Sequence, residues 1–380
     1  MKILYIGPWA SDLALFGRRA TNQAATAWSR GLLGALKEAG CSIRVCTHCR
    51  EQFWPLGEML PGEEPDFPES FPVRFSRYWN IPRLRDFSLM GAYRRMIWDE
   101  VTECRPDVVL LYNMEPCHCA ASDELTTLQV PWIPIILDEN EVGERGWISF
   151  SERVGGAAGL VFLSYWGFAN CPLQLPKLHL DGGVCAENMK GLDEVVGVDE
   201  RKTVVYSGVY DEGYGGLNYL FDVFTAVETP SCRFVLTGKD AKGNLKRTLR
   251  REPRVEYRGL VTRKELHDIH CGATVFVNPR PVEASANRMT FPSKLLEYLS
   301  YGKPVVSTWT EGLAPDYRDV LLVPEGHTPE AFARLVDEAL NFSFDERRAL
   351  QRRIAAWAVS HTWERQAKRL VEFIESLECG

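Results

Sequence analysis

Short apolar runs alternate along this chain with longer stretches in which apolar residues recur every three or four positions. Continuous apolar runs are typical of strands buried in a parallel sheet, and the wider spacing is typical of helices that pack through one face. Residues 2–6 (KILYI) and 107–112 (DVVLLY) show the first pattern, and 21–39 shows the second. The pattern predicts an α/β fold of alternating strands and helices.

The alternation is interrupted between residues 185 and 200 (CAENMKGLDEVVGVDE), where acidic residues are frequent and no apolar period is present. It restarts with the strand-like run TVVYSG at 203–208. A chain of 380 residues also exceeds the usual size of one core. We therefore expect two doubly wound domains, at 1–184 and 201–360, connected by residues 185–200.

Composition narrows the class of protein. A hydrophobic content of 45% and a charged content of 25% are those of a soluble globular protein. The formal net charge of −7 argues against a general nucleic-acid binder. No window is apolar enough to span a bilayer, and the opening MKILYIGPWA is typical of a first strand rather than a signal peptide. We therefore expect a cytoplasmic protein.

The 11 cysteines follow no regular spacing, which favours reduced thiols over a disulfide framework. Two clusters, Cys46-Thr-His-Cys49 and Cys117-His118-Cys119, would each follow a strand of the first domain. They raise the possibility of a zinc site, which needs about four converging ligands. The favoured alternative is that these thiols are buried or idle.

The most informative stretch runs from Asn278 to Ser307 (NPRPVEASANRMTFPSKLLEYLSYGKPVVS). It predicts a buried strand, a loop and a helix that opens at FPSK, with Pro292 in the first turn. Such a helix would present Ser293, Lys294 and free backbone N–H groups to an anion such as phosphate. Glu297, one turn later, could accept two hydrogen bonds from a ribose diol.

This stretch resembles the nucleotide-sugar site of retaining glycosyltransferases of the GT-B fold, in the large family 4. The pattern NPRP…FPSK-LEYL-GKPV is most similar to that of the bacterial polysaccharide-assembly members. The resemblance implies two Rossmann-like domains facing each other across a cleft. It also implies a nucleotide-diphosphate sugar as donor substrate, with no further cofactor and no metal.

The resemblance carries over to individual positions. Glu283 and Glu297 match the two acidic residues that bracket the donor in that family, and the implied catalytic residues are Glu283, Lys294 and Asp138. Candidate donor contacts lie in the second domain: Gly208, Tyr210, Gly238, Leu260, Val261, Arg280, Pro292, Ser293, Lys294 and Glu297. Candidate acceptor-side contacts lie in the first domain: Gly17, Arg18, Asn140 and Glu141.

Two positions depart from the family pattern. The loop at 209–216 lacks the Arg and Lys that bind the diphosphate in many members, so its charge would fall to Lys294, Arg280 and backbone N–H groups. The strand at 132–137 ends in acidic residues, with Asp138 first, where many members have a histidine. A histidine-assisted scheme is therefore not expected.

Two segments outside the site also suggest roles. Residues 77–98 interleave arginines with aromatic residues, which fits contact with an anionic membrane or, alternatively, a helix that turns its aromatics inward. In similar enzymes a C-terminal helix containing tryptophan crosses back to the first domain, and residues 361–380 match it.

The resemblance implies transfer of a sugar, with retention, to a glycan or lipid-linked acceptor. Front-face attack, in which the leaving phosphate takes the acceptor proton, needs no dedicated nucleophile. The missing Arg and Lys motivate an alternative, a catalytically silent GT-B binding or scaffold protein. A transferase acting on a small metabolite or nucleic acid is a third reading, although the acidic total makes nucleic acid an unlikely partner.

Overall fold

The computed structural model describes residues 1–10, 23–62, 71–137, 144–189, 202–210, 216–240, 243, 245, 249–280 and 286–378. The chain divides into two compact units. Unit 1 comprises Met1–Gly183 together with Trp363–Gly380, and unit 2 comprises Val184–Thr362. Each unit is built around its own parallel sheet, so the predicted α/β fold with two Rossmann-like domains is confirmed.

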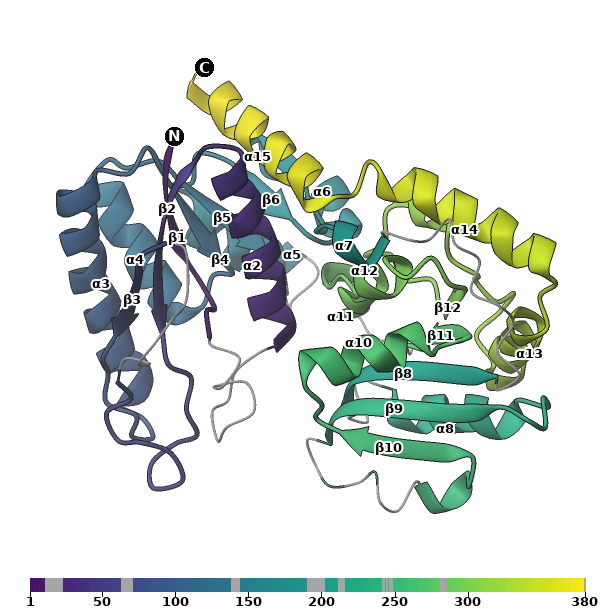
Figure 1. Cartoon of the computed structure of the whole chain (residues 1–380). Helices are drawn as coiled ribbons and strands as arrows, with labels where there is room; N and C mark the ends of the chain where they lie inside the picture. The colour runs from purple at the N-terminus through teal and green to yellow at the C-terminus, as the bar shows by residue number, and fades with distance from the viewer. Residues whose placement is uncertain are drawn as a thin grey trace. The chain divides into compact units, whose positions relative to one another are not determined.

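Unit 1 contains a seven-stranded parallel sheet in the order β3-β2-β1-β4-β5-β6-β7 (Figure 1). Its strands are β1 (Lys2–Ile6), β2 (Ser42–His48), β3 (Val73–Ser76), β4 (Val108–Tyr112), β5 (Trp132–Ile136), β6 (Leu160–Phe162) and β7 (Lys177–His179). Its helices are α2 (Gln23–Glu38), α3 (Arg85–Cys104), α4 (Pro116–Thr127), α5 (Glu144–Val154), α6 (Tyr165–Asn170) and α15 (Trp363–Glu378).

The inner strands of unit 1 follow directly from their sequences. Every residue of β4 and β5 is buried, as expected for strands covered on both faces. The chain runs outward from β1 through β2 to β3, and then returns to β4 on the other side of β1. The carboxyl ends of β1 and β4 therefore form a topological switch point, the place where open α/β sheets bind ligands.

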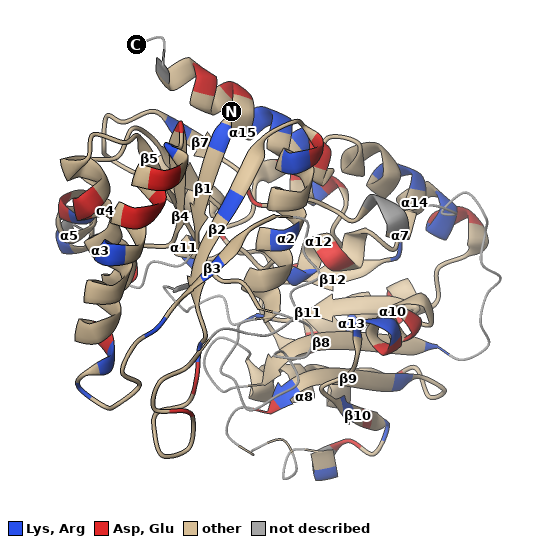
Figure 2. Ribbon diagram, turned by 60° about the vertical axis from the view of Figure 1, so that its left-hand side comes forward, with Lys and Arg blue, Asp and Glu red and all other residues tan. Residues whose placement is uncertain are grey.

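Helix α3 is fixed to the edge of the sheet by a buried carboxylate. Glu100 is 1% exposed, and it accepts hydrogen bonds from Arg44 Nε on β2 at 2.7 Å and from Arg74 Nη1 on β3 at 3.1 Å. Basic and acidic residues are interspersed on the helices around this sheet (Figure 2). Paired in this way, the buried carboxylate holds one helix to two strands.

The last helix of the chain packs in unit 1. Helix α15 lies along α2, and its first residue, Trp363, makes an edge-on contact with Trp28 at a centroid distance of 5.8 Å. The Trp363 indole occupies the space in which Gly31 and Gly183 have no side chain. The two ends of the sequence are thus parts of one core.

Unit 2 contains a five-stranded parallel sheet in the order β10-β9-β8-β11-β12. Its strands are β8 (Thr203–Tyr210), β9 (Arg233–Asp240), β10 (Val255–Gly259), β11 (Val275–Asn278) and β12 (Val305–Ser307). Its α-helices are α7 (Ala186–Met189), α8 (Leu217–Ala226), α10 (Arg263–Cys271), α11 (Ala286–Met289), α12 (Lys294–Leu299), α13 (Pro329–Leu340) and α14 (Phe344–Ala358). Two short 3₁₀ turns, Leu249–Arg251 and Pro315–Asp319, complete it.

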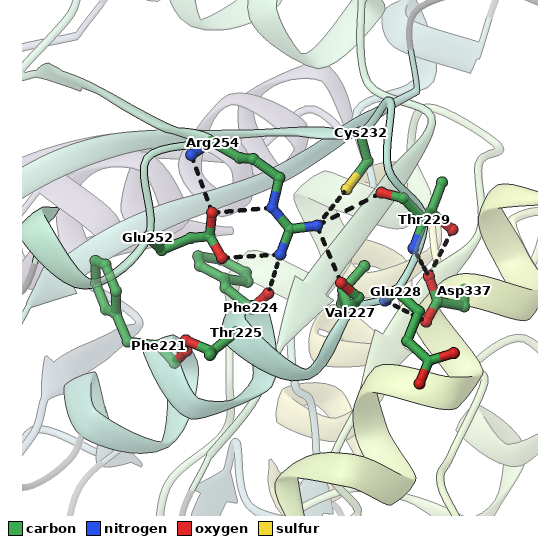
Figure 3. Close-up of polar contacts among 10 residues, drawn as sticks. All are labelled: Phe221, Phe224, Thr225, Val227, Glu228, Thr229, Cys232, Glu252, Arg254 and Asp337. Atoms are coloured by element: carbon green, nitrogen blue, oxygen red, sulfur yellow. Dashed lines mark hydrogen bonds and ion pairs between the residues drawn. The ribbon is translucent and has the colours of Figure 1, made fainter.

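A polar network anchored on Arg254 closes the end of α8 (Figure 3). The guanidinium group makes two contacts with the carboxylate of Glu252, at 2.9 and 2.8 Å. It also donates to the carbonyl oxygens of Phe224 at 2.7 Å and Val227 at 3.0 Å. A helix leaves its last carbonyl groups unpaired, and a cation there satisfies them.

Candidate functional site

Helix α12 brings the charged residues of the FPSK-LEYL motif to the carboxyl end of β8. The ammonium group of Lys294 lies 3.9 Å from the centroid of the Tyr206 ring, a cation–π contact. A Cβ atom added at Gly208 would lie 2.7 Å from Lys294 Nζ. The absence of a side chain at 208 therefore leaves room for the lysine ammonium at the end of the strand.

The opposite face of α12 is anchored in the core. Leu295, Leu296 and Leu299 are buried, as the sequence predicted. The Tyr298 ring stacks on Phe276 of β11 at 4.4 Å, and its hydroxyl accepts a hydrogen bond from the backbone N–H of Ser207 at 2.7 Å. This packing fixes the helix against β8 and β11 and so positions Lys294 and Glu297.

A chain of hydrogen bonds leads from the sheet to His270, whose ring lies beside Glu297. Thr237 Oγ1 donates to Ser207 Oγ at 2.9 Å, so the Ser207 hydroxyl is free to donate to His270 Nε2, also at 2.9 Å. The neutral His270 ring then carries its proton on Nδ1. Nδ1 is buried, has no hydrogen-bond partner among the described residues and lies 3.6 Å from Glu297 Oε1.

The proton affinities of this pair are strongly shifted. Burial, with Lys303 nearby, lowers the pKa of His270 to about 3, so the ring is neutral at physiological pH. Burial raises the pKa of the Glu297 carboxyl to about 7, against the opposing charge of Lys294. The side chain of Glu297 nevertheless keeps 43% of its surface exposed, so its carboxyl is both accessible and poised to titrate. We call Tyr206, Gly208, His270, Lys294 and Glu297 the α12 cluster.

Two of the predicted donor contacts have structural roles in unit 2. Tyr210 is 1% exposed, and its hydroxyl donates to the carbonyl of Thr237 at 2.8 Å, so its side chain belongs to the core of unit 2. Gly238 has a φ of +121°, and a Cβ there would lie 1.8 Å from the Gly208 carbonyl oxygen. Glycine is required at 238 by the close approach of β8 and β9.

The other predicted donor contacts that the structure describes lie outside the helices and strands of unit 2. The backbone N–H of Arg280 donates to Thr308 Oγ1 at 2.8 Å. Pro292 is buried and Ser293 half-buried just before α12. The helix begins at Lys294, the last residue of FPSK, with Ser293 at its N-cap, so the prediction that Pro292 lies in the first turn is wrong. Leu260 is 45% exposed after β10, and Val261 is half-buried beside it.

Six of the predicted site residues lie outside the described part of the chain. They are Glu283, Asp138, Gly17, Arg18, Asn140 and Glu141. Their roles remain predictions. His270 and Ser207 were missed by sequence reasoning, because single polar residues in a helix and a strand carry no motif.

The two cysteine and histidine clusters of unit 1 are arranged without convergence of their thiols. Cys46 and Cys117 are buried, Cys49 Sγ donates to the Gly62 carbonyl at 2.8 Å, and Cys119 Sγ lies 3.4 Å from the Met114 carbonyl oxygen. Within the described ranges, no group of three or more His, Cys, Asp or Glu side chains is placed to hold a metal ion.

Comparison with known proteins finds a family match for part of the chain. Residues 201–341 match the family described as "Glycosyl transferases group 1". None of the curated proteins matches the sequence.

The whole fold resembles solved glycosyltransferase structures. A glycosyltransferase from Rickettsia africae ESF-5 aligns with a TM-score of 0.73 at 10% identity, over 99% of this chain and 98% of that one. The lipopolysaccharide outer core galactosyltransferase WaaB aligns with a TM-score of 0.65 at 14% identity, over 99% of each chain. Anabaena Alr3699/HepE aligns with a TM-score of 0.67 at 12% identity, over 99% of this chain and 100% of that one. The chain therefore has the GT-B fold, and its residues 201–341 are similar to the group 1 glycosyl transferases.

Proposed function

We propose that the protein is a retaining glycosyltransferase of the family 4 type. It would move a sugar from a nucleotide-diphosphate sugar to a glycan or lipid-linked acceptor. The observation that carries the proposal is the α12 cluster, in which a lysine and an accessible carboxylate from one short helix lie at the carboxyl end of β8. Structural neighbours in complex with UDP and glucose, or with UDP-2-fluoro glucose, support this class of donor.

Each member of the α12 cluster would have a distinct task. Ionised Glu297 would accept the two hydroxyl groups of the ribose, because a carboxylate accepts hydrogen bonds through both oxygens. Lys294 would balance the charge that develops on the departing diphosphate, together with backbone N–H groups. A cation already in place makes a metal-independent reaction feasible, with the leaving phosphate taking the acceptor proton.

Separate binding of nucleoside and nucleoside diphosphate tests these assignments. Lys294→Ala should weaken the diphosphate by roughly tenfold while leaving the nucleoside nearly unchanged, since a charged hydrogen bond is lost only for the phosphate. Glu297→Ala should weaken both. The exposed Lys264 on α10 provides a control, Lys264→Ala, with no expected effect. An equal loss of both ligands in Lys294→Ala would contradict its phosphate role.

Donor hydrolysis separates an enzyme from a silent scaffold. The first screen is thermal unfolding with UDP, GDP, ADP, CMP and dTDP and their sugars, because a ligand that binds the folded state raises the melting temperature. A donor that both stabilises the protein and is slowly hydrolysed without acceptor supports the transferase. Stabilisation without any hydrolysis would instead favour a catalytically silent binding protein.

We further propose that unit 1 contacts an anionic membrane surface through an exposed apolar patch. Among the described residues, no helix is both long and apolar enough to cross a bilayer. The patch combines large exposed side chains of 53–60 with others at 79–87: Phe53, Trp54, Leu56, Met59, Leu60, Trp79, Leu84 and Phe87. Exposed arginines flank it at positions 77, 83, 94 and 95.

The two segments of the patch are fixed to each other. Asn80 accepts a backbone hydrogen bond from Trp54 at 3.0 Å and donates one to Met59 at 2.8 Å, and the Arg85 guanidinium lies 3.8 Å from the centroid of the Phe53 ring. Aromatic and aliphatic groups beside cations fit the interface of an anionic bilayer. Tyr93, Met96 and Ile97 of α3 point inward, so only part of 77–98 belongs to this surface.

Vesicle sedimentation tests the membrane proposal. The protein should bind phosphatidylglycerol vesicles more strongly than phosphatidylcholine vesicles, and Phe87→Ser should reduce that binding. Phe344→Ser, at an exposed phenylalanine of unit 2, is the matched control. Equal binding by both variants, or none by the wild type, would rule out this surface as a membrane contact.

A further inference from the structure

A second set of polar groups converges in unit 1, away from the α12 cluster. A cavity at the carboxyl ends of β1, β2 and β4 lies at the topological switch point of the sheet. We call it the switch-point pocket. The polar and aromatic residues that matter for its chemistry are Trp9, His48, Arg50, Asn113, Glu115 and His118.

His118 presents a fixed hydrogen-bond acceptor. Its Nδ1 lies 3.2 Å from the carbonyl oxygen of Asn113, and because a carbonyl can only accept, Nδ1 carries the proton. Burial lowers the pKa of His118, so the ring is neutral and Nε2 keeps a lone pair. The proton therefore stays on the nitrogen that faces the backbone.

Asn113 holds this arrangement in place. It has a φ of +62° at the end of β4, a conformation that asparagine tolerates better than most residues. Its side-chain Oδ1 accepts from the backbone N–H of Leu137 at 2.9 Å. This hydrogen bond helps to fix Asn113, whose carbonyl oxygen orients His118.

A hydrogen bond with Tyr93 orients the His48 ring. His48 Nδ1 and the Tyr93 hydroxyl share a hydrogen bond of 2.8 Å, and Tyr93 is fully buried. Burial and the charge of Arg50 lower the pKa of His48 well below its usual range, which keeps this ring neutral as well. The remaining ring nitrogen, Nε2, is thus the polar atom that His48 can offer to a ligand.

The charged groups of the pocket balance each other. Arg50 forms an ion pair with Glu115 through Nη2 and Oε1, which leaves further N–H donors on the guanidinium and a second carboxylate oxygen on Glu115. The buried Nε1 of Trp9 has no hydrogen-bond partner among the described residues. Donors and acceptors are therefore both present, without a net charge.

From this lining we infer that the switch-point pocket binds a neutral, hydroxyl-rich ring such as one monosaccharide unit. A hydroxyl group both donates and accepts, and so can meet Glu115 and His118 as well as Arg50 and Trp9. An anion could use only the donors and would be repelled by the acceptors. The cavity, about 170 Å³, is smaller than the usual site for a drug-sized ligand, which suits a single ring.

If the protein is the proposed glycosyltransferase, the bound ring would be a sugar unit of the acceptor; this assignment rests on the proposed function. Its hydroxyl groups would be recognised by His48, Glu115 and His118. The two histidines come from the motifs Cys46-Thr-His-Cys49 and Cys117-His118-Cys119, and they, rather than the thiols, line the cavity. Binding itself requires neither donor nor turnover.

Saturation-transfer NMR on the full chain, without nucleotide, tests the inference. The probes are the methyl α-glycosides of glucose, galactose and mannose, with inorganic phosphate as the anionic competitor. We expect at least one glycoside to receive saturation and phosphate to displace none of it. Lack of transfer to all three, or displacement by phosphate, would overturn the inference.

A matched pair of variants locates the binding. Glu115 is partly exposed and makes no side-chain cap on α4, so Glu115→Ala should keep its fold and weaken the glycoside by roughly tenfold, the loss of one charged hydrogen bond. Asp123→Asn, on the exposed face of the same helix, should leave it unchanged. Equal affinity in both variants would overturn the assignment.

Nucleotide binding distinguishes this inference from the proposed function. Glu115→Ala should bind nucleoside diphosphate as the wild type does. If the wild type binds a glycoside but no nucleotide, the proposed function fails while the pocket stands. If it binds nucleotide but no glycoside, the reverse holds.

Discussion

At the scale of single residues, the α12 cluster depends on which ring nitrogen of His270 carries the proton. The order Thr237, Ser207, His270 directs each donor toward Glu297. The carboxyl then has a neutral N–H 3.6 Å away and the charge of Lys294 nearby. Both favour the ionised, accepting form that ribose hydroxyls need, and both oppose the effect of burial.

Substitution of His270 by the two amides tests that order. Asparagine can place its side-chain amide near the former Nδ1, whereas glutamine places its amide near the former Nε2. We expect His270→Gln to weaken nucleotide binding more than His270→Asn, measured by isothermal titration calorimetry. If the KM for the donor changes equally in both variants, His270 fills space and does not position Glu297.

The raised pKa of Glu297 predicts a pH dependence for nucleotide binding. The carboxyl ionises as pH rises through about 7, and only the ionised form accepts two hydroxyl groups. Affinity should therefore rise with pH, by up to tenfold per unit below the pKa, and level off above about pH 8. Titration calorimetry across this range measures it, and Glu297→Gln should remove the dependence. A flat profile in the wild type would contradict the raised pKa or the ribose role.

At the scale of elements, the Arg254 network predicts a difference between two similar ion pairs. Arg254 reaches Glu252 two residues earlier and also pairs the last carbonyls of α8, whereas the exposed Arg258 forms an ion pair with the half-buried Glu256. Arg254→Gln should lower the free energy of unfolding by about 2 kcal/mol. Arg258→Gln should change it by less than about 0.5 kcal/mol. Urea unfolding compares the two, and similar losses would show that the α8 carbonyls contribute little.

The sequence predicted individual strands and helices better than it predicted the contacts between them. The apolar runs at 2–6 and 203–208 correspond to β1 and β8, because a strand buried on both faces has a continuous apolar sequence. Lys294 and Glu297 could also be predicted from the sequence, because both lie within one short motif on a single helix. His270 and Ser207, which lie 63 positions apart, meet only through packing of α10 on the sheet, and no local pattern encodes that contact.

The switch-point pocket shows the same limit. Its histidines were visible in the sequence, but their neighbouring cysteines suggested metal binding. Which side chain reaches the cavity depends on where it lies along β2 and α4. Cys46 and Cys117 are buried while His48 and His118 line the pocket. Cys46 and His48 are two residues apart and share one face of β2, but His48 is the last residue of the strand and lies beside the cavity.

At the scale of the whole molecule, unit 1 is completed by the last part of the chain. The contact is made where Trp363 fills the space left by Gly31 on α2 and by Gly183. The core of unit 1 therefore includes α15. Because the Trp363 ring lies directly against these glycines, an added methyl group on either glycine should disturb the contact between α15 and α2.

Two glycines of α2 provide a matched test of that closure. A Cβ at Gly31 would lie 2.2 Å from the Trp363 ring, whereas a Cβ at Gly34 would meet nothing within 4 Å. Gly31→Ala should therefore lower the free energy of unfolding by about 1–3 kcal/mol through overpacking. Gly34→Ala should raise it by about 0.5–1 kcal/mol, because alanine favours the helix. Thermal and urea unfolding measure both, with Trp363 fluorescence reporting on the contact. If Gly31→Ala proved as stabilising as Gly34→Ala, the contact between Trp363 and α2 would contribute little to the free energy of unfolding. The stability of unit 1 would then not depend on the packing of α15.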